Sequence, residues 1–248
     1  ILDEIRDKKK IYDININGSK NVFHACLDTG TSWIILVSSI AAFGAHPDNP
    51  LPLREEDYPR GDSRCYYSYS KAEVEHYLAR LHEDHPELET TILRPCVIVG
   101  ENMDNTVSYL FARRIAASPR GLDPHTQLIH EEDLARAIQL VLHRRATGIY
   151  HLTSDDTIAM SEMLRRAGII APPLPVEFLC RLMDAVFWLR LSPISSHWIN
   201  MFRHSMVGSN EKIKRELGWH PSYTSRELFE EVLRAGRKGK RRGGRNNN

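Results

Sequence analysis

The chain has 248 residues, of which 42% are hydrophobic, so it can bury the core of one sizeable domain or of one domain with a smaller lobe. Its formal net charge is +1, but without six basic residues near the end of the chain it falls to −5: Arg237, Lys238, Lys240, Arg241, Arg242 and Arg245. Because the chain without this basic tail is mildly acidic, we expect no positively charged surface for nucleic acid, and a small-molecule partner is favoured. The alternative of a nucleic-acid-binding arm concerns the basic tail alone.

The first predicted elements are a helix and a buried strand. Apolar residues recur at helical spacing over 15–26, and Gly30 supplies a stop signal soon after. Residues 33–37 then form a short continuous apolar run, which is typical of a strand covered on both faces in a parallel sheet. This strand ends at Ser38 and Ser39.

A loop, a helix and a second buried strand follow. Residues 44–62 are rich in Pro and Asp and show no periodicity, and this segment is long enough to be a functional loop. We expect a long helix over 67–85 and a strand over 90–99. Helices that alternate with buried strands predict an α/β fold with a doubly wound parallel sheet.

Helical patterns dominate the rest of the chain. We expect helices over 106–117, 132–143, 161–167, 176–191 and 225–235, with a short strand over 148–152. Residues 1–125 are therefore interpreted as part of a dinucleotide-binding domain, and residues 126–236 as a smaller, mainly helical substrate lobe. Residues 237–248 form a basic tail that we expect to be disordered.

The cysteines and the apolar stretches limit the function classes further. The four cysteines lie far apart without a Cys-x-x-Cys pair, so we expect neither disulfides nor a zinc knuckle, and a cytoplasmic location fits. The histidines lack the spacing of a known metal site, and no metal is expected. The apolar stretch 178–191 contains Arg181, Asp184 and Arg190, so it is too charged to span a bilayer and favours a core-facing helix or a pocket wall.

Two residues of the predicted helix 67–85 form a candidate acid/base pair. Tyr67 and Lys71 are four positions apart, which places their side chains on one face of the helix, one turn apart. A free tyrosine has a pKa of ~10, and a nearby ammonium group favours the phenolate and lowers that pKa. We therefore expect Lys71 to make Tyr67 an acid/base group near neutral pH.

A hydroxyl group stands at the end of the first buried strand. Open α/β sheets bind their ligands beyond the carboxyl ends of the strands, and Ser38 and Ser39 lie at such a position. A serine hydroxyl at this place can hydrogen-bond a substrate carbonyl or alkoxide while a tyrosine handles the proton. A turn or cap residue is the alternative interpretation of a serine after a strand.

With these residues in this order, the chain resembles the extended short-chain dehydrogenases, which include nucleotide-sugar epimerases and 3β-hydroxysteroid dehydrogenase-like enzymes. Five segments match that family in its order: 15–21, 37–44, 67–71, 93–100 and 217–221. The resemblance implies a Rossmann-type sheet, a cofactor that is NAD or NADP, and a small-molecule substrate. A homodimer is compatible with it.

The resemblance assigns roles to individual residues. It makes Ser39 the hydroxyl that polarises the substrate carbonyl, Tyr67 the general acid/base, and Lys71 a residue that both tunes Tyr67 and binds the cofactor ribose. Further residues that it implies at the cofactor are Asn15, Ser38, Pro95 and Val97. A helix N-cap is the alternative for Asn15, and a bend at a strand end is the alternative for Pro95.

The sequence also departs from the family. The Gly-rich turn that binds the cofactor pyrophosphate is absent, so we expect the first strands of the domain to be missing and the chain by itself to be inactive. Ser39-Ile40-Ala41 replaces the Thr-Asp-Glu of dehydratases, which argues against sugar dehydration as the reaction. Thr126-Gln127 stands where epimerases carry an arginine, so no phosphate clamp is visible there.

The expected function is hydride transfer at a secondary alcohol or ketone by an NAD(P)-dependent oxidoreductase or epimerase. A nucleotide sugar, a sterol-like compound and another alcohol remain open as substrates. The alternative is a non-catalytic protein that binds or senses a dinucleotide on the same fold. The joint presence of Ser39, Tyr67 and Lys71 favours the enzyme.

Overall fold

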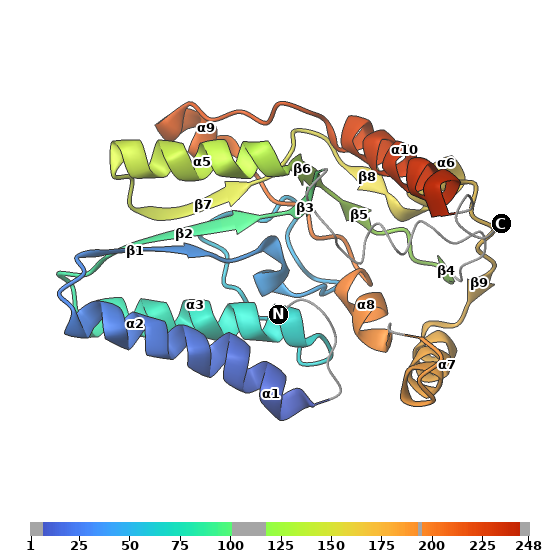
Figure 1. Ribbon diagram of the computed structural model, residues 1–248, viewed down its shortest axis with the longest axis horizontal. Coiled ribbons are helices and arrows are strands. Elements are labelled where there is room, and N and C mark those ends of the chain that lie inside the picture. Colours follow the sequence, from blue (N-terminus) through green and yellow to red (C-terminus); the bar gives the residue numbers. More distant parts are fainter. Residues whose placement is uncertain (1–6, 101–117, 193–194, 244–248) are drawn as a thin grey trace.

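Three parallel strands form the central sheet of the protein, in the order β1 (Trp33–Val37), β2 (Glu89–Pro95) and β7 (Gly148–Leu152) (Figure 1). The computed structural model describes residues 7–100, 118–192 and 195–243. Trp33 pairs with Glu89, and Thr91 pairs with Gly148, each in parallel register. The predicted α/β fold with a parallel sheet is confirmed.

Helices cover both faces of this sheet (Figure 1). One face carries the helical run α1 (Lys8–Tyr12), η1 (Asp13–Asn17) and α2 (Gly18–Asp28) together with α3 (Tyr66–Asp84), and the other face carries α5 (Glu131–Arg144) and α9 (Glu211–Leu217). The apolar stripe of α3, with Val74, Leu78 and Leu81, packs against Ile34 and Ile92 of the sheet. This packing fixes α3 beside the ends of β1 and β2.

The predicted strand 90–99 is interrupted in the structure. Cys96 N still donates to Leu152 O of β7 at 3.0 Å, but β3 (Val97–Val99) then pairs with β6 (Leu128–His130) in a second, two-stranded sheet. Pro95 at the end of β2 has no N–H group to continue the ladder. The chain therefore changes partners at Cys96, and the prediction of one continuous strand is wrong.

The second half of the chain contributes to the central sheet. The strand β7 falls within 126–236, which we assigned to the substrate lobe, yet it pairs with β2 in the middle of the fold. The remaining elements are η2 (Ile40–Phe43), β4 (Ser118–Pro119), β5 (His125–Thr126), β8 (Ile158–Ala159), α6 (Met160–Ala167), β9 (Pro173–Leu174), α7 (Val176–Trp188), α8 (Ser196–Met201) and α10 (Ser225–Gly243). The boundary at residue 125 stays a prediction, but it does not follow the sheet.

Two other expectations concern the end and the middle of the chain. The helix α10 continues to Gly243, although we expected disorder from residue 237, and residues 244–248 lie outside the described part. The predicted helix 106–117 also lies outside it. In the described ranges, no helix is both long and apolar enough to cross a membrane.

Candidate active site

The carboxyl ends of β1 and β2 bring Ser39 and Pro95 together. Ser39 follows β1, and its Oγ accepts a hydrogen bond from Ala41 N at 3.1 Å, so that it caps the short helix η2. The same Oγ lies 3.4 Å from the carbonyl oxygen of Pro95 and donates to it. Ser39 thus serves both as the local cap and as a hydroxyl at the expected ligand-binding edge of the sheet.

The second predicted catalytic residue lies beside the first. Tyr67 stands in the first turn of α3, and its phenol lies close enough to the Ser39 hydroxyl for that group to influence its pKa. Burial raises the pKa of Tyr67 above its ordinary value of 10.0, and the interaction with the Ser39 hydroxyl opposes part of that rise. The phenol is therefore protonated at neutral pH.

Lys71 lies one helical turn after Tyr67, and its Nζ is 5.7 Å from the centre of the tyrosine ring. This ammonium group donates to the carbonyl oxygen of Val37, at the end of β1, over 2.9 Å. Burial lowers the pKa of Lys71, and the Glu75 carboxylate counteracts that shift. We predicted that Lys71 lowers the pKa of Tyr67, but the net direction is upward, and burial of the phenol is the largest cause of that rise.

Asn15 lies on the helical run that packs against α3. It is part of η1, a π-helical turn between α1 and α2, and its carbonyl oxygen accepts a hydrogen bond from Ser19 Oγ at 2.7 Å. It is therefore inside a continuous helical run and is not an N-cap residue. Single π-helical turns occur often at functional sites, which is compatible with the role that the resemblance implies for Asn15.

The two other residues assigned to the cofactor are engaged elsewhere. Ser38 donates its hydroxyl to Glu75 on α3, so a cofactor contact by this residue would not involve a free hydroxyl group. Val97 opens β3 and packs, half-buried, against the apolar cluster that contains Val99 and Leu128. Ser39, Tyr67, Lys71 and Pro95 are thus gathered at one edge, and Val97 lies at the start of the second sheet.

A buried ion pair that we did not predict from the sequence lies next to the groups at the sheet edge. Arg94 and Glu75 are 2% and 3% exposed, and Arg94 Nη2 donates to Glu75 Oε2 at 2.7 Å. Arg94 Nε also donates to Glu75 Oε1 at 3.2 Å and to Oε2 at 3.0 Å, so Arg94 binds both oxygens of the carboxylate. Ser38, Glu75 and Arg94 therefore form one network that ties α3 to the ends of β1 and β2.

His151 and Glu55 extend this network to β7. Arg94 Nη1 lies 3.3 Å from His151 Nε2, and the backbone amide of His151 donates to Glu55 Oε1 at 3.1 Å. Burial, with the charge of Arg94 as a second cause, lowers the pKa of His151 to about 3. Burial also raises the pKa of Glu55. Glu55 and Leu53 are 8% and 1% exposed, so the predicted functional loop 44–62 sends side chains into the core.

The start of α3 is held by α8, a helix that we did not predict. The backbone amide of Tyr66 donates to His197 Nδ1 at 3.2 Å, and the rings of the two residues stack with their centres 5.8 Å apart. Since Nδ1 is the acceptor, the neutral ring carries its proton on Nε2, which lies 3.7 Å from Cys65 Sγ. The signal for α8 was Ser195, whose hydroxyl caps the helix by accepting from His197 N.

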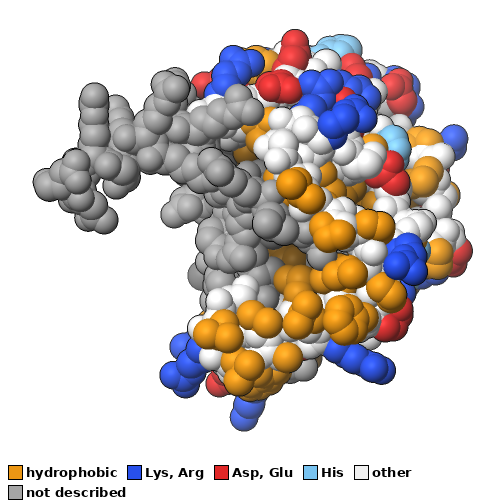
Figure 2. Space-filling model, turned by 90° about the vertical axis from the view of Figure 1, so that its right-hand side faces the viewer, with side chains coloured by type: hydrophobic (Ala, Val, Ile, Leu, Met, Phe, Trp, Pro, Cys, Tyr) orange, Lys and Arg blue, Asp and Glu red, His pale blue; other side chains and the backbone are white. Residues whose placement is uncertain are grey.

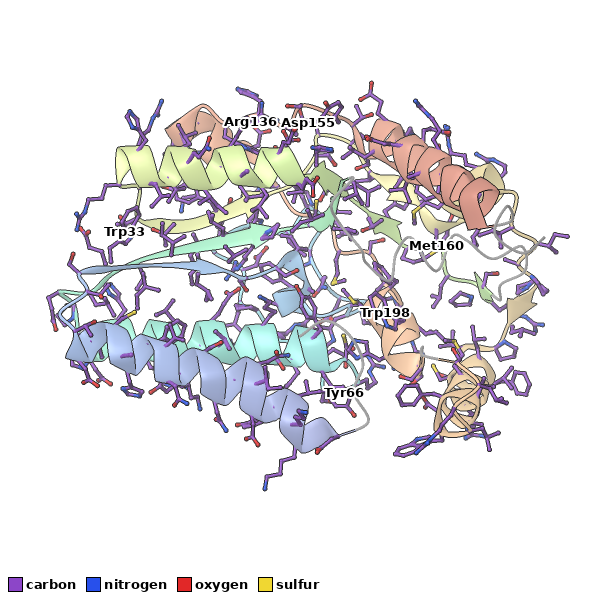
Figure 3. The ribbon with its side chains drawn as sticks, in the orientation of Figure 1. Trp33, Tyr66, Arg136, Asp155, Met160 and Trp198 are labelled. Atoms are coloured by element: carbon purple, nitrogen blue, oxygen red, sulfur yellow. The ribbon has the colours of Figure 1, made fainter. Side chains whose placement is uncertain are left out.

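An apolar wall stands beside the predicted catalytic tyrosine. Tyr67 packs against the buried cluster of Ala41, Cys65, Trp198 and Met201, together with Met183 of α7 and Phe202. Figure 3 shows Trp198 of α8 in the region next to Tyr66 at the start of α3. The interpretation of 178–191 as a core-facing helix or pocket wall therefore fits Met183 and the buried Leu179 and Phe187.

A cavity among the described residues lies elsewhere. It has a volume of about 530 Å³ and is lined by residues that include Gln127, Asp155, Asn210 and Lys214, but by none of the predicted catalytic residues. Asp155 lies on the opposite side of the sheet from Tyr66 (Figure 3). Lys214 Nζ is neutralised by Asp155 at 2.6 Å, so the cavity offers no free cation to an anionic ligand. Over the described ranges, no group of three or more His, Cys, Asp or Glu side chains could hold a metal ion.

The chain has relatives of similar sequence. An uncharacterized protein of Mycobacterium tuberculosis (strain ATCC 25618 / H37Rv) is 26% identical over 226 residues, which are 90% of this chain and 59% of the relative. The UDP-glucose 4-epimerase of Vibrio cholerae is 25% identical over 236 residues, which are 90% of this chain and 69% of that enzyme. The chain thus spans about 59% of the length of the mycobacterial relatives.

Solved structures and a family model agree with this similarity. The structure of gox2253 matches with a TM-score of 0.70 at 23% identity, over 95% of this chain and 75% of that one. The UDP-glucose 4-epimerase of Thermus thermophilus matches with a TM-score of 0.64 at 21% identity, over 91% and 70% of the two chains. Residues 1–152 match the model of the NAD dependent epimerase/dehydratase family. Since this match covers more than half of the chain, the protein belongs to the NAD dependent epimerase/dehydratase family, as the resemblance to extended short-chain dehydrogenases predicts.

Proposed function

We propose that the chain carries the reacting groups of an NAD(P)-dependent oxidoreductase or epimerase, which transfers hydride at a secondary alcohol or ketone. The observation that carries this proposal is the placement of the Ser39 and Tyr67 hydroxyls beside each other, with Lys71 one turn further along the same helix. These groups converge at the carboxyl ends of parallel strands, where open α/β sheets bind ligands.

Each of the three residues has a distinct task in this proposal. Ser39 holds the substrate oxygen by a hydrogen bond, and Tyr67 exchanges a proton with that oxygen while the bound NAD(P) supplies or accepts the hydride. The raised pKa of Tyr67 keeps the phenol protonated, which suits the direction in which an alkoxide develops and must be neutralised. In the opposite direction Tyr67 must act as a base, and a charged Lys71 beside the ring favours its phenolate form.

The donor set fits one end of a dinucleotide. Lys71 would hold the ribose next to the nicotinamide, and Asn15 and Pro95 would lie along the nicotinamide itself, because all three stand around Tyr67 or on the elements that pack against α3. The sequence of 248 residues contains no Gly-x-x-Gly-x-x-Gly turn that could bind the pyrophosphate. The preference for NAD or NADP is consequently not encoded in these groups.

An alcohol attached to an apolar body is the substrate class that the site favours. Trp198, Met183 and Phe202 lie in the cluster that packs against Tyr67. Gln127, next to the position where epimerases carry an arginine, uses its side chain to bind Ser154 O at 2.7 Å and Gly208 N at 2.8 Å. It is therefore not available to a substrate phosphate, and the wall offers apolar contact instead.

Relatives whose names include lipid-like substrates support this choice. An Escherichia coli O157:H7 enzyme named N-acetyl-alpha-D-glucosaminyl-diphospho-ditrans,octacis-undecaprenol 4-epimerase is 34% identical over 115 residues, which are 46% of this chain and 33% of that enzyme. The human 3 beta-hydroxysteroid dehydrogenase type 7 is 33% identical over 99 residues, 38% of this chain and 27% of the enzyme. Because the UDP-glucose 4-epimerase of Vibrio cholerae is also similar to this chain, a nucleotide sugar is the competing candidate substrate.

The test is a Tyr67→Phe variant assayed with NAD and NADP against sterol-like alcohols, polyisoprenoid-linked sugars and nucleotide sugars. Turnover should fall ~10²–10⁴-fold while the dinucleotide affinity changes little, because only the proton-transfer group is lost. The matched control is Tyr69→Phe, which removes a phenol two residues away on the same helix and should keep turnover. Dinucleotide binding without turnover of any of these substrates would instead indicate the non-catalytic sensor, and unchanged turnover in Tyr67→Phe would refute the assigned mechanism.

A further inference from the structure

One surface of the protein gathers large apolar side chains that the fold leaves in solvent. They belong to α7 and to the three residues that follow it: Phe178, Leu182, Trp188, Leu189 and Leu191, with exposed fractions between 45% and 74%. We refer to these five residues as the α7 patch. Figure 2, which views the end of the molecule that carries α7, shows apolar side chains over much of this face. Contiguous exposed apolar patches mark interaction sites on soluble proteins.

The spacing along α7 explains how the patch forms. Phe178, Leu182 and Leu189 recur at intervals that keep them on one stripe of the helix. Leu179 and Phe187 recur on the opposite stripe and are buried against the rest of the protein. A helix with two apolar faces can satisfy only one of them by packing within the chain, and the other face needs a second apolar medium.

The charged residues around the patch differ in their partners. Glu177, whose side chain is 70% exposed, pairs with Arg203 at 2.8 Å, and Asp184 accepts a hydrogen bond from Ser196 N at 3.0 Å. Arg181 and Arg190 are exposed and form no ion pair with any described residue. The rim of the patch therefore carries net positive charge, which complements an anionic surface.

We propose that the α7 patch docks on the surface of a lipid bilayer that contains anionic lipids. Apolar side chains with an interfacial tryptophan and flanking arginines are the composition of helices that lie in the plane of a membrane interface.

The bilayer fits better than a second copy of the chain. In a two-fold symmetric dimer through the α7 patch, the same unpaired arginines would lie on both sides of one interface, and like charges at an interface oppose association. Headgroup phosphates offer the opposite charge. The helix that carries the patch also contacts the predicted active site, because Met183 of α7 packs in the same cluster as Tyr67. Docking would thus place that site close to molecules dissolved in the membrane, although the docking itself does not depend on the proposed reaction.

The fluorescence of Trp188 can report this docking. Trp188 is 65% exposed, whereas Trp198 and Trp219 are 5% and 3% exposed and Trp33 is half-buried at the start of β1, so Trp188 is the tryptophan whose surroundings would change most. The protein is titrated with vesicles of phosphatidylcholine alone and with vesicles that contain phosphatidylglycerol as well, and binding is checked by flotation. We expect a blue shift and co-flotation with the anionic vesicles, both weakened by salt, and loss of the shift in Trp188→Phe.

A double variant tests whether the α7 patch, and not the rest of the surface, binds the vesicles. Leu182→Glu with Leu189→Glu should weaken vesicle binding by at least about tenfold, because it replaces two exposed apolar side chains by like-charged carboxylates that face anionic lipid. The matched control is Leu142→Glu on α5, a leucine with 54% exposure outside the patch, which should bind vesicles as the unchanged protein does. Circular dichroism of each variant confirms that the fold is retained. Absence of vesicle binding by the unchanged protein overturns the proposal, as does equal binding by the double variant or a dimer that only the double variant loses.

Discussion

Ser38 and Ser39 are neighbours in the chain and serve two different regions of the molecule. The Ser38 hydroxyl enters a fully buried network in which Glu75 binds Arg94, and Arg94 lies beside His151. The Ser39 hydroxyl contacts Tyr67 at the open edge of the sheet, beside the half-buried Lys71. Consecutive residues of an extended strand point to opposite sides, so one strand end supplies both regions.

The difference between the two regions lies in how their polar groups are satisfied. In the buried network every charge has a partner at hydrogen-bond distance, which is the condition under which charges persist in a protein interior. At the sheet edge, by contrast, Tyr67 keeps a raised pKa and Lys71 a lowered one, so burial disfavours both charged forms. The network fixes geometry, while the edge holds groups whose charge can change during a reaction.

The largest expected effect comes from breaking the buried ion pair. Arg94→Met should destabilise the protein by about 3–5 kcal/mol, because it leaves the Glu75 carboxylate buried without its partner. Chemical denaturation at neutral pH measures this change. The control is Arg60→Met, which removes an exposed partner of Asp48 and should cost less than about 1 kcal/mol. Similar losses in both variants would show that the network does not hold the fold.

A smaller effect concerns the pH dependence of stability. The folded-state pKa of His151 is about 3, below its ordinary value of 6.5. Between these two pH values the His151 ring is protonated in the unfolded chain and neutral in the folded chain. The stability that comes from a neutral His151 is therefore complete above about pH 6.5 and is lost as the pH falls toward about 3, by an amount on the order of a few kcal/mol.

Denaturation curves between pH 7 and pH 4 test this expectation. His151→Gln should flatten the fall in unfolding free energy with decreasing pH, although His197, whose pKa burial lowers to about 4, retains its own share. His143→Gln on the exposed surface of α5 serves as the control and should leave the slope unchanged. Parallel curves for the unchanged protein and for His151→Gln would contradict the assignment of His151 to the buried network.

The smallest effect distinguishes the two serines directly. Ser39→Ala should raise the pKa of Tyr67 further, because the interaction with the Ser39 hydroxyl opposes the rise that burial causes. Ser38→Ala should leave that pKa in place, since its hydroxyl binds Glu75 instead. The phenol carbon signal of isotopically labelled tyrosine, assigned with Tyr67→Phe, follows the titration. A shift caused by Ser38→Ala and not by Ser39→Ala would reverse the two roles.

The sequence by itself determined the elements whose signals are local. The strands β1 and β7 begin and end at the predicted residues, and α3 agrees with the prediction to within one residue, because apolar periodicity and turn residues are read within a short window. The four-residue spacing of Tyr67 and Lys71 placed both on one face of α3 for the same reason. The family followed from short motifs in a fixed order, and the match over residues 1–152 confirms it.

Tertiary structure alone decided the features that depend on partners far away in the chain. The partner change after Pro95, the capture of Ser38 by Glu75 and the contact of α8 with the start of α3 join residues between 31 and 132 positions apart. The direction of the Tyr67 pKa shift also required the fold, since burial of the phenol is the largest cause of the rise. A sequence window records neither burial nor long-range contact, and both arise only when the chain is packed.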